Sequence, residues 1–95
     1  MERKEKFTEG PWVGRMDALA FQGLVYSEST GNDIAVCYDH GNVDGNTRLI
    51  AAAPDMYALL HDVMTEITSG GGDWLAVLDY KADDIRLLLD KINGE

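Results

Sequence analysis

The chain has 95 residues, which is enough for one hydrophobic core and too few for two, so we expect a single domain over residues 1–95. Its hydrophobic share of 45% and charged share of 26% are typical of a globular protein and exclude a disordered one. A net charge of −9 disfavours direct binding of DNA or RNA, and no segment has the pattern of a signal peptide or a membrane span. The single cysteine, Cys37, excludes an internal disulfide and is typical of a reducing compartment, so we expect a cytoplasmic location.

The chain opens with a charged segment and a turn. Residues 1–9 mix both signs of charge without a period, and we expect them to be flexible. Gly10 and Pro11 form a turn signal, and Trp12 follows as the start of the first apolar run. A single aromatic side chain after a turn usually packs, so we expect Trp12 to contact the helices.

The next part predicts a sheet. Residues 19–27 are rich in strand formers, with Gly23 as a bulge, and residues 34–38 form a second apolar run after a turn cluster. The two runs predict an antiparallel hairpin. Both faces of the 34–38 strand are apolar, which predicts a central strand or one covered on both sides. A short antiparallel sheet of two to three strands should therefore occupy residues 12–38.

A kinked helix is expected over residues 46–68. Asn46 is a preferred N-cap residue and begins a run of good helix formers. Pro54 removes a hydrogen-bond donor, so the helix must kink or stop and restart there. The apolar positions repeat at helical spacing and predict an inward seam: Leu49, Ala53, Met56, Leu60, Val63 and Ile67.

A C-terminal helix is expected over residues 74–93, ending at Gly94. We favour one continuous helix, although a break over residues 79–83 is the alternative. Its apolar positions repeat in the same way: Leu75, Leu78, Ala82, Ile85, Leu89 and Ile92. Two such helices joined by a glycine-rich loop predict an antiparallel helical hairpin. The expected fold class is thus α+β, with the sheet followed by the hairpin.

Apolar residues outside these seams are candidates for an interface, most simply with a second copy of the chain in a homodimer. They are Tyr57, Leu59, Met64, Trp74, Val77, Leu87 and Leu88.

Acidic residues are expected on the outer faces of the helices: Asp62, Glu66, Asp73, Asp79, Asp83, Asp84 and Asp90. They form either a solubilising surface or a surface that presents charge to a basic groove on another protein.

The reactive side chains do not predict catalysis. Cys37, Asp39 and His40 lie close in sequence, but on a strand His40 points away from Cys37, and no basic neighbour is present to activate the thiol. The metal-ligand spacings of known sites are missing, so we expect no metal, no cofactor and no catalytic residue. His61 is expected at a solvated or boundary position. A small-ligand site would need a pocket around Cys37, His40 and Tyr57.

Residues 46–56, with the sequence N-T-R-L-I-A-A-A-P-D-M, resemble the N-A-R-L-I-A-A-A-P-D/E-L/M segment of a group of short phage and prophage proteins. Thr47 departs from the usual alanine. Members of the group are also similar in an early Gly-Pro-Trp, here at residues 10–12, and in an Ile-Ala pair, here at residues 34–35. The resemblance implies a phage or prophage origin and carries no catalytic residues.

These observations predict a non-catalytic accessory protein of a phage or prophage that binds protein, either a second copy of itself or a host factor. The alternative is an acidic mimic of nucleic acid that inhibits a DNA-binding or defence enzyme of the host.

Overall fold

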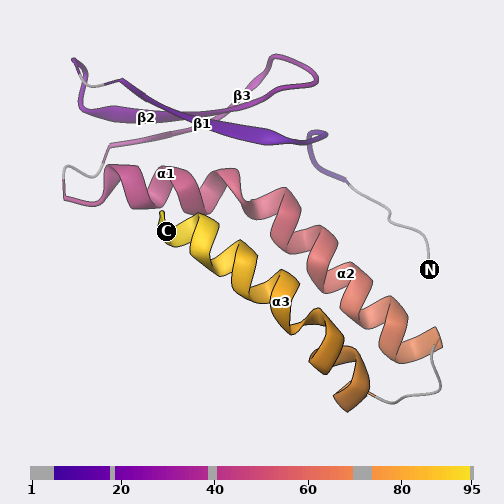
Figure 1. Ribbon diagram of the computed structural model, residues 1–95. Coiled ribbons are helices and arrows are strands. Elements are labelled where there is room, and N and C mark those ends of the chain that lie inside the picture. Colours follow the sequence, from indigo (N-terminus) through magenta and orange to yellow (C-terminus); the bar gives the residue numbers. More distant parts are fainter. Residues whose placement is uncertain (1–5, 18, 39–40, 70–73, 95) are drawn as a thin grey trace.

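A computed structural model describes residues 6–17, 19–38, 41–69 and 74–94 of the chain (Figure 1). These residues form a three-stranded antiparallel sheet followed by helices, so the predicted α+β class is confirmed. The elements are β1 (Trp12–Asp17), β2 (Gln22–Ser27), β3 (Asp33–Cys37), α1 (Val43–Ala51), α2 (Ala53–Ser69) and α3 (Trp74–Asn93).

The sheet has β2 in the centre, with β1 and β3 antiparallel on either side. The expectation that the 34–38 strand is central or covered on both faces is wrong, because β3 is an edge strand. Val36 on its outer face is exposed. The described helices all lie on the other side of the sheet (Figure 1).

β2 is shorter than the predicted strand. It begins at Gln22 and not at residue 19, because the residues before it form the turn from β1. In this turn the Asp17 carboxylate accepts a hydrogen bond from the Ala20 N–H at 3.2 Å. Phe21 has a φ of 52°, a left-handed conformation outside the extended range of a regular strand.

The bulge predicted at Gly23 is also wrong. Gly23 pairs regularly with both neighbouring strands, and the irregularity lies between Val25 and Tyr26. Gly23 instead gives α1 room to approach the sheet, because a Cβ atom there would overlap the Oγ1 atom of Thr47. A Cβ atom at Gly14 would lie 2.9 Å from the Cγ2 atom of the same threonine.

α1 begins earlier than the sequence predicts. Its N-cap is Asn42 and its first residue is Val43, whereas we expected the cap at Asn46. Asp44 in the first turn favours the longer helix, because its carboxylate complements the helix dipole and forms an ion pair with Arg48 one turn later.

The restart at Pro54 is confirmed. α1 ends at Ala51, and α2 begins at Ala53 with Pro54 as its second residue. A proline there costs no hydrogen bond, because the N–H groups of a first helical turn have no partner within the helix. Ala52 between the helices is only 2% exposed, so the change of direction seen in Figure 1 lies in the core.

α2 and α3 form the predicted antiparallel hairpin. α3 is continuous through residues 79–83, so the alternative break is wrong. Lys91 Nζ lies 3.1 Å from Asp55 Oδ2 near one end of the hairpin, and the Tyr80 hydroxyl donates to Glu66 Oε2 at 2.8 Å nearer the other. These pairs fix the register of the two helices.

The end of α3 is attached to α1. Arg48 Nε donates a hydrogen bond to the Ile92 carbonyl at 2.9 Å. Gly94 ends α3 with a φ of 79°, as predicted, and the guanidinium group of Arg48 lies against it.

Phe7, in the segment that we expect to be flexible, contacts two aromatic rings of the fold. Its ring lies 6.1 Å from the Trp12 ring and 5.0 Å from the Tyr57 ring, both edge to face. Residues 1–5 lie outside the described residues.

Candidate interaction surface

α2 and α3 meet through side chains that we expected on the outside. Leu59 of α2 and Leu88 of α3 line the same hollow between the helices, and Val77 is only 5% exposed. Tyr57 packs against Phe7. These four candidate interface residues therefore make contacts within the chain.

The other three candidate interface residues are Met64, Leu87 and Trp74. Met64 and Leu87 are exposed, whereas the side chain of Trp74 lies outside the described part of the structure. The off-seam residues thus do not form one continuous surface.

The predicted seams form such a surface instead. We call it the helical face. It consists of Met56, Leu60, Val63 and Ile67 of α2 with Leu75, Leu78, Ala82, Ile85, Leu89 and Ile92 of α3.

Helix geometry places both halves of the helical face on one side of the hairpin. Leu59 and Asp62 of α2 line the hollow between the helices. With 3.6 residues per turn, the α2 residues of the helical face lie about 100° further around the helix, viewed along the chain. On α3, Lys81 and Leu88 line the same hollow, and the α3 residues of the helical face lie about 100° from them in the same sense. Because the two helices run in opposite directions, equal rotations bring both stripes to the same side.

The helical face is partly exposed. Leu60 is 68%, Leu75 65% and Leu89 54% exposed, Leu78 and Ala82 are also exposed, and the other five members are half-buried. The expectation that these seams face inward is therefore wrong for the leucines. The sequence shows that each helix has two apolar sides, but it contains no signal that says which side α2 and α3 present to each other.

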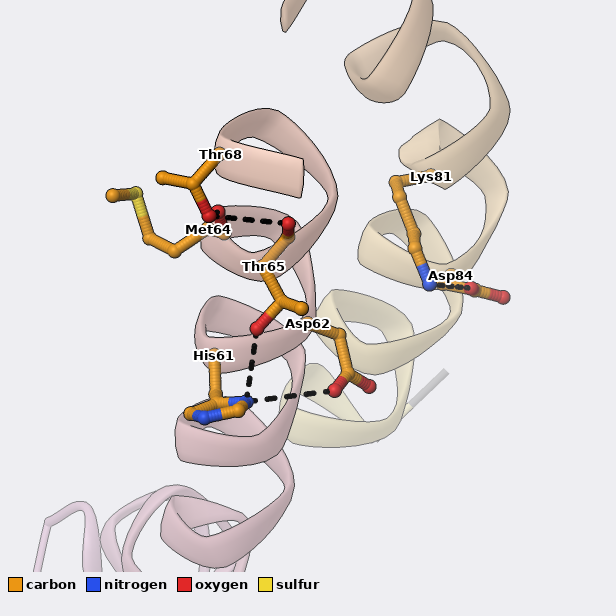
Figure 2. A network of polar contacts seen from close by, with 7 residues as sticks. All are labelled: His61, Asp62, Met64, Thr65, Thr68, Lys81 and Asp84. Carbon is orange, nitrogen blue, oxygen red and sulfur yellow. Dashed lines mark hydrogen bonds and ion pairs between the residues drawn. The ribbon is translucent and has the colours of Figure 1, made fainter. Parts of the chain in front are cut away.

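A polar network occupies a different side of the hairpin (Figure 2). His61 Nδ1 lies 3.5 Å from the Thr65 hydroxyl and 3.9 Å from Asp62 Oδ1, and Asp62 points towards α3 whereas Met64 points away from it. The His61 side chain is 13% exposed, which agrees with the predicted boundary position.

Most of the candidate acidic residues have partners nearby. Glu66 accepts from Tyr80. Asp83 pairs with Arg86 at 2.7 Å, and Asp84 with Lys81 at 3.9 Å.

The other acidic residues differ in their surroundings. Asp62 and Asp84 lie at the rim of the open hollow between α2 and α3, with side chains 43% and 59% exposed. Asp79 is exposed and Asp90 half-buried, while Asp73 lies outside the described residues.

The segment that resembles phage proteins connects the parts of the fold. Thr47 is 3% exposed and packs on the sheet, Arg48 holds the end of α3, and Pro54 starts α2. Its residues have architectural roles.

The reactive side chains are only partly described. Cys37 is 8% exposed and pairs with Gly23 on the side of the sheet that α1 covers. Tyr57 lies elsewhere, against Phe7, and the structure does not bring it to Cys37. Asp39 and His40 lie outside the described residues. Within the described ranges, no three His, Cys, Asp or Glu side chains are grouped to hold a metal ion.

A shallow hollow of about 310 Å³ lies between β1, α1 and the end of α3. Trp12, Arg48 and Lys91 contribute to its lining. Both cations already have anionic partners, Asp44 for Arg48 and Asp55 for Lys91, so the hollow offers little net positive charge to a ligand.

No helix in the described part of the chain is long and apolar enough to cross a membrane.

Together, the fold and this surface define a small α+β protein with a broad apolar contact face on a helical hairpin. A protein-family model described as Salmonella phage P22 protein Y8K6 matches residues 1–90. The chain therefore belongs to this family of phage proteins, and the phage origin inferred from residues 46–56 is supported. No curated protein and no solved structure matches the chain.

Proposed function

We propose that this phage protein is a non-catalytic accessory protein that acts in the cytoplasm of the bacterial host by binding protein through the helical face. The observation that carries the proposal is the exposure of its large leucines, Leu60, Leu75 and Leu89, on one side of the hairpin.

An exposed apolar face is energetically unfavourable in a monomer. Apolar surface in water costs about 25 cal/mol per Å², and soluble monomers rarely expose contiguous apolar patches beyond a few hundred Å². The ten residues of the helical face include no ionisable side chain, in a chain with 26% charged residues. A surface of this kind is typical of a protein interface.

The nucleic-acid mimic is the alternative proposal. Its support is the net charge of −9. We favour protein binding through the helical face, because ion pairs with Lys81 and Arg86 partly neutralise Asp84 and Asp83. A mimic needs such carboxylates free to replace phosphates.

Affinity capture of the tagged chain from host cells tests the proposal. We compare the wild type with Leu89→Glu, which places a charge in the helical face. The matched control is Leu87→Glu, which changes a leucine of similar exposure, 64% against 54%, on another side of α3. The wild type and the control should capture the same partner, which is either an untagged copy of the chain or a host protein. Leu89→Glu should not capture it.

Equal recovery by all three chains would contradict the proposal. If capture of the partner instead decreases steeply with salt concentration and persists in Leu89→Glu, the nucleic-acid mimic becomes the better hypothesis.

A further inference from the structure

We infer that the occupant of the helical face is a second copy of this chain, and that two hairpins pair about a two-fold axis as a four-helix bundle. The inference rests on the proposed function, because it names the partner of the same surface.

The size of the exposed surface fits a dimer. The chain has an accessible surface of 6530 Å². A compact monomer of 10.5 kDa exposes about 5,400 Å² by the usual scaling with mass. The excess of about 1,100 Å² is spread over the whole elongated chain, and it leaves room for the ~800 Å² that each partner contributes to a standard interface.

The shape of the chain leads to the same conclusion. Its radius of gyration is 15.7 Å, and its extents are 52 × 27 × 16 Å. A compact domain of this length has a radius of gyration of about 12.4 Å. The hairpin extends beyond the sheet (Figure 1), so much of it has no layer packed on its apolar side.

Charge also favours a second copy at this place. Two chains of net charge −9 repel each other wherever their acidic surfaces meet. The helical face contains no ionisable residue, so contact there brings no carboxylates together and buries none.

The geometry is that of a helical bundle. α2 and α3 contain 17 and 20 residues, so they are about 25 and 30 Å long. Paired stripes of leucine and isoleucine on antiparallel helices pack against an identical pair at a shallow crossing angle. A two-fold axis presents the same surface on both copies, so one face is sufficient to close the assembly without leaving a free end.

Sedimentation equilibrium of the full-length chain tests the inference. The wild type and Leu87→Glu should sediment with twice the chain mass of 10.5 kDa at about 100 µM. Leu89→Glu should weaken self-association by at least about a hundredfold, because a dimer would bury its charge without a partner. Far-UV circular dichroism checks that each variant is folded. Leu60→Glu on α2 is a second variant at an exposed site.

The outcomes separate the inference from the proposed function. A folded wild type that is monomeric at about 100 µM overturns the dimer. So does a dimer that both Leu89→Glu and Leu60→Glu leave intact. If the wild type is monomeric but captures a host protein that Leu89→Glu loses, the proposed function stands and only the second copy is wrong.

Discussion

At the scale of single residues, the contact of Thr47 with two glycines decides how closely α1 approaches the sheet. Gly14 and Gly23 lie under the threonine, and neither position has room for a Cβ atom without a shift. The Thr47 hydroxyl donates to the Val43 carbonyl of its own helix at 2.6 Å, so its polar atom is satisfied although the residue is buried. This explains how a threonine is accommodated in the contact between α1 and the sheet.

Gly23→Ala should therefore lower the free energy of unfolding by about 3 kcal/mol or more, because the added methyl group overlaps Thr47. Urea denaturation measures the change. Gly45→Ala is the control: its Cβ atom meets nothing nearer than Arg48 at 3.9 Å, and alanine in a helix should raise stability by about 0.5 kcal/mol. Adding Thr47→Ala to Gly23→Ala should recover part of the loss. A Gly23→Ala chain as stable as the wild type would show that α1 does not lie this close to the sheet.

Tyr80 reports on the register of the hairpin. Its hydrogen bond to Glu66, and then desolvation and the negative charge of Glu66, raise the pKa of the Tyr80 phenol above its ordinary value. Because the folded pKa is raised, the associated stability is present below the ordinary pKa of tyrosine and is lost as the pH rises through the folded value.

Glu66→Ala should lower the pKa of Tyr80 towards the ordinary value, because the acceptor and its charge are both removed. An NMR titration of the tyrosine ring carbons measures it. Glu28→Ala, a change of an exposed glutamate in the sheet region, should leave the pKa of Tyr80 unchanged. If Tyr80 has the same pKa in Glu66→Ala as in the wild type, α2 and α3 meet in another register.

At the scale of elements, Arg48 attaches the end of α3 to α1. The last carbonyls of a helix lack partners within the helix, and a guanidinium group satisfies the one at Ile92 while complementing the negative end of the dipole. Arg48 therefore has a structural role at the junction of α1 and α3.

Arg48→Met should lower the free energy of unfolding by about 1 kcal/mol through loss of this hydrogen bond. It should also speed hydrogen exchange in the last turn of α3. Arg86→Met is the matched control, because the Arg86–Asp83 pair is exposed and contributes less than about 0.5 kcal/mol. Equal effects of the two substitutions would contradict the attachment.

The elements themselves could largely be predicted from the sequence. Pro54 and Gly94 act locally through backbone geometry, so the restart of α2 and the end of α3 were predictable. The edge position of β3 was not, because the apolar pattern of a strand does not show whether a neighbour exists. The orientation of the helices was not predictable either. Leu88 and Leu89 are equally apolar, and only tertiary packing decides that the first lies towards α2 and the second towards solvent.

At the scale of the whole molecule, the elongated shape and the uneven chemistry of the hairpin govern association. The helical face is uncharged, whereas the chain as a whole has a net charge of −9. Self-association through this face must therefore overcome repulsion between the remaining surfaces.

Raising the salt concentration should strengthen dimerisation. Between about 0.05 and 0.5 M salt, the Debye length falls from about 14 to about 4 Å, so the repulsion is screened while apolar contact is retained. We expect a decrease in the dissociation constant of about threefold to tenfold, measured by sedimentation equilibrium. Weaker association at high salt would instead indicate an interface held by opposite charges, as expected for a mimic with a basic partner.

The place of Cys37 has a practical consequence. The only thiol of the chain lies between the sheet and α1, paired with Gly23. A thiol reagent reaches it when this layer opens, so the labelling rate of the unmodified chain measures how often the first helix lifts from the sheet. The wild-type protein thus contains its own probe of that opening.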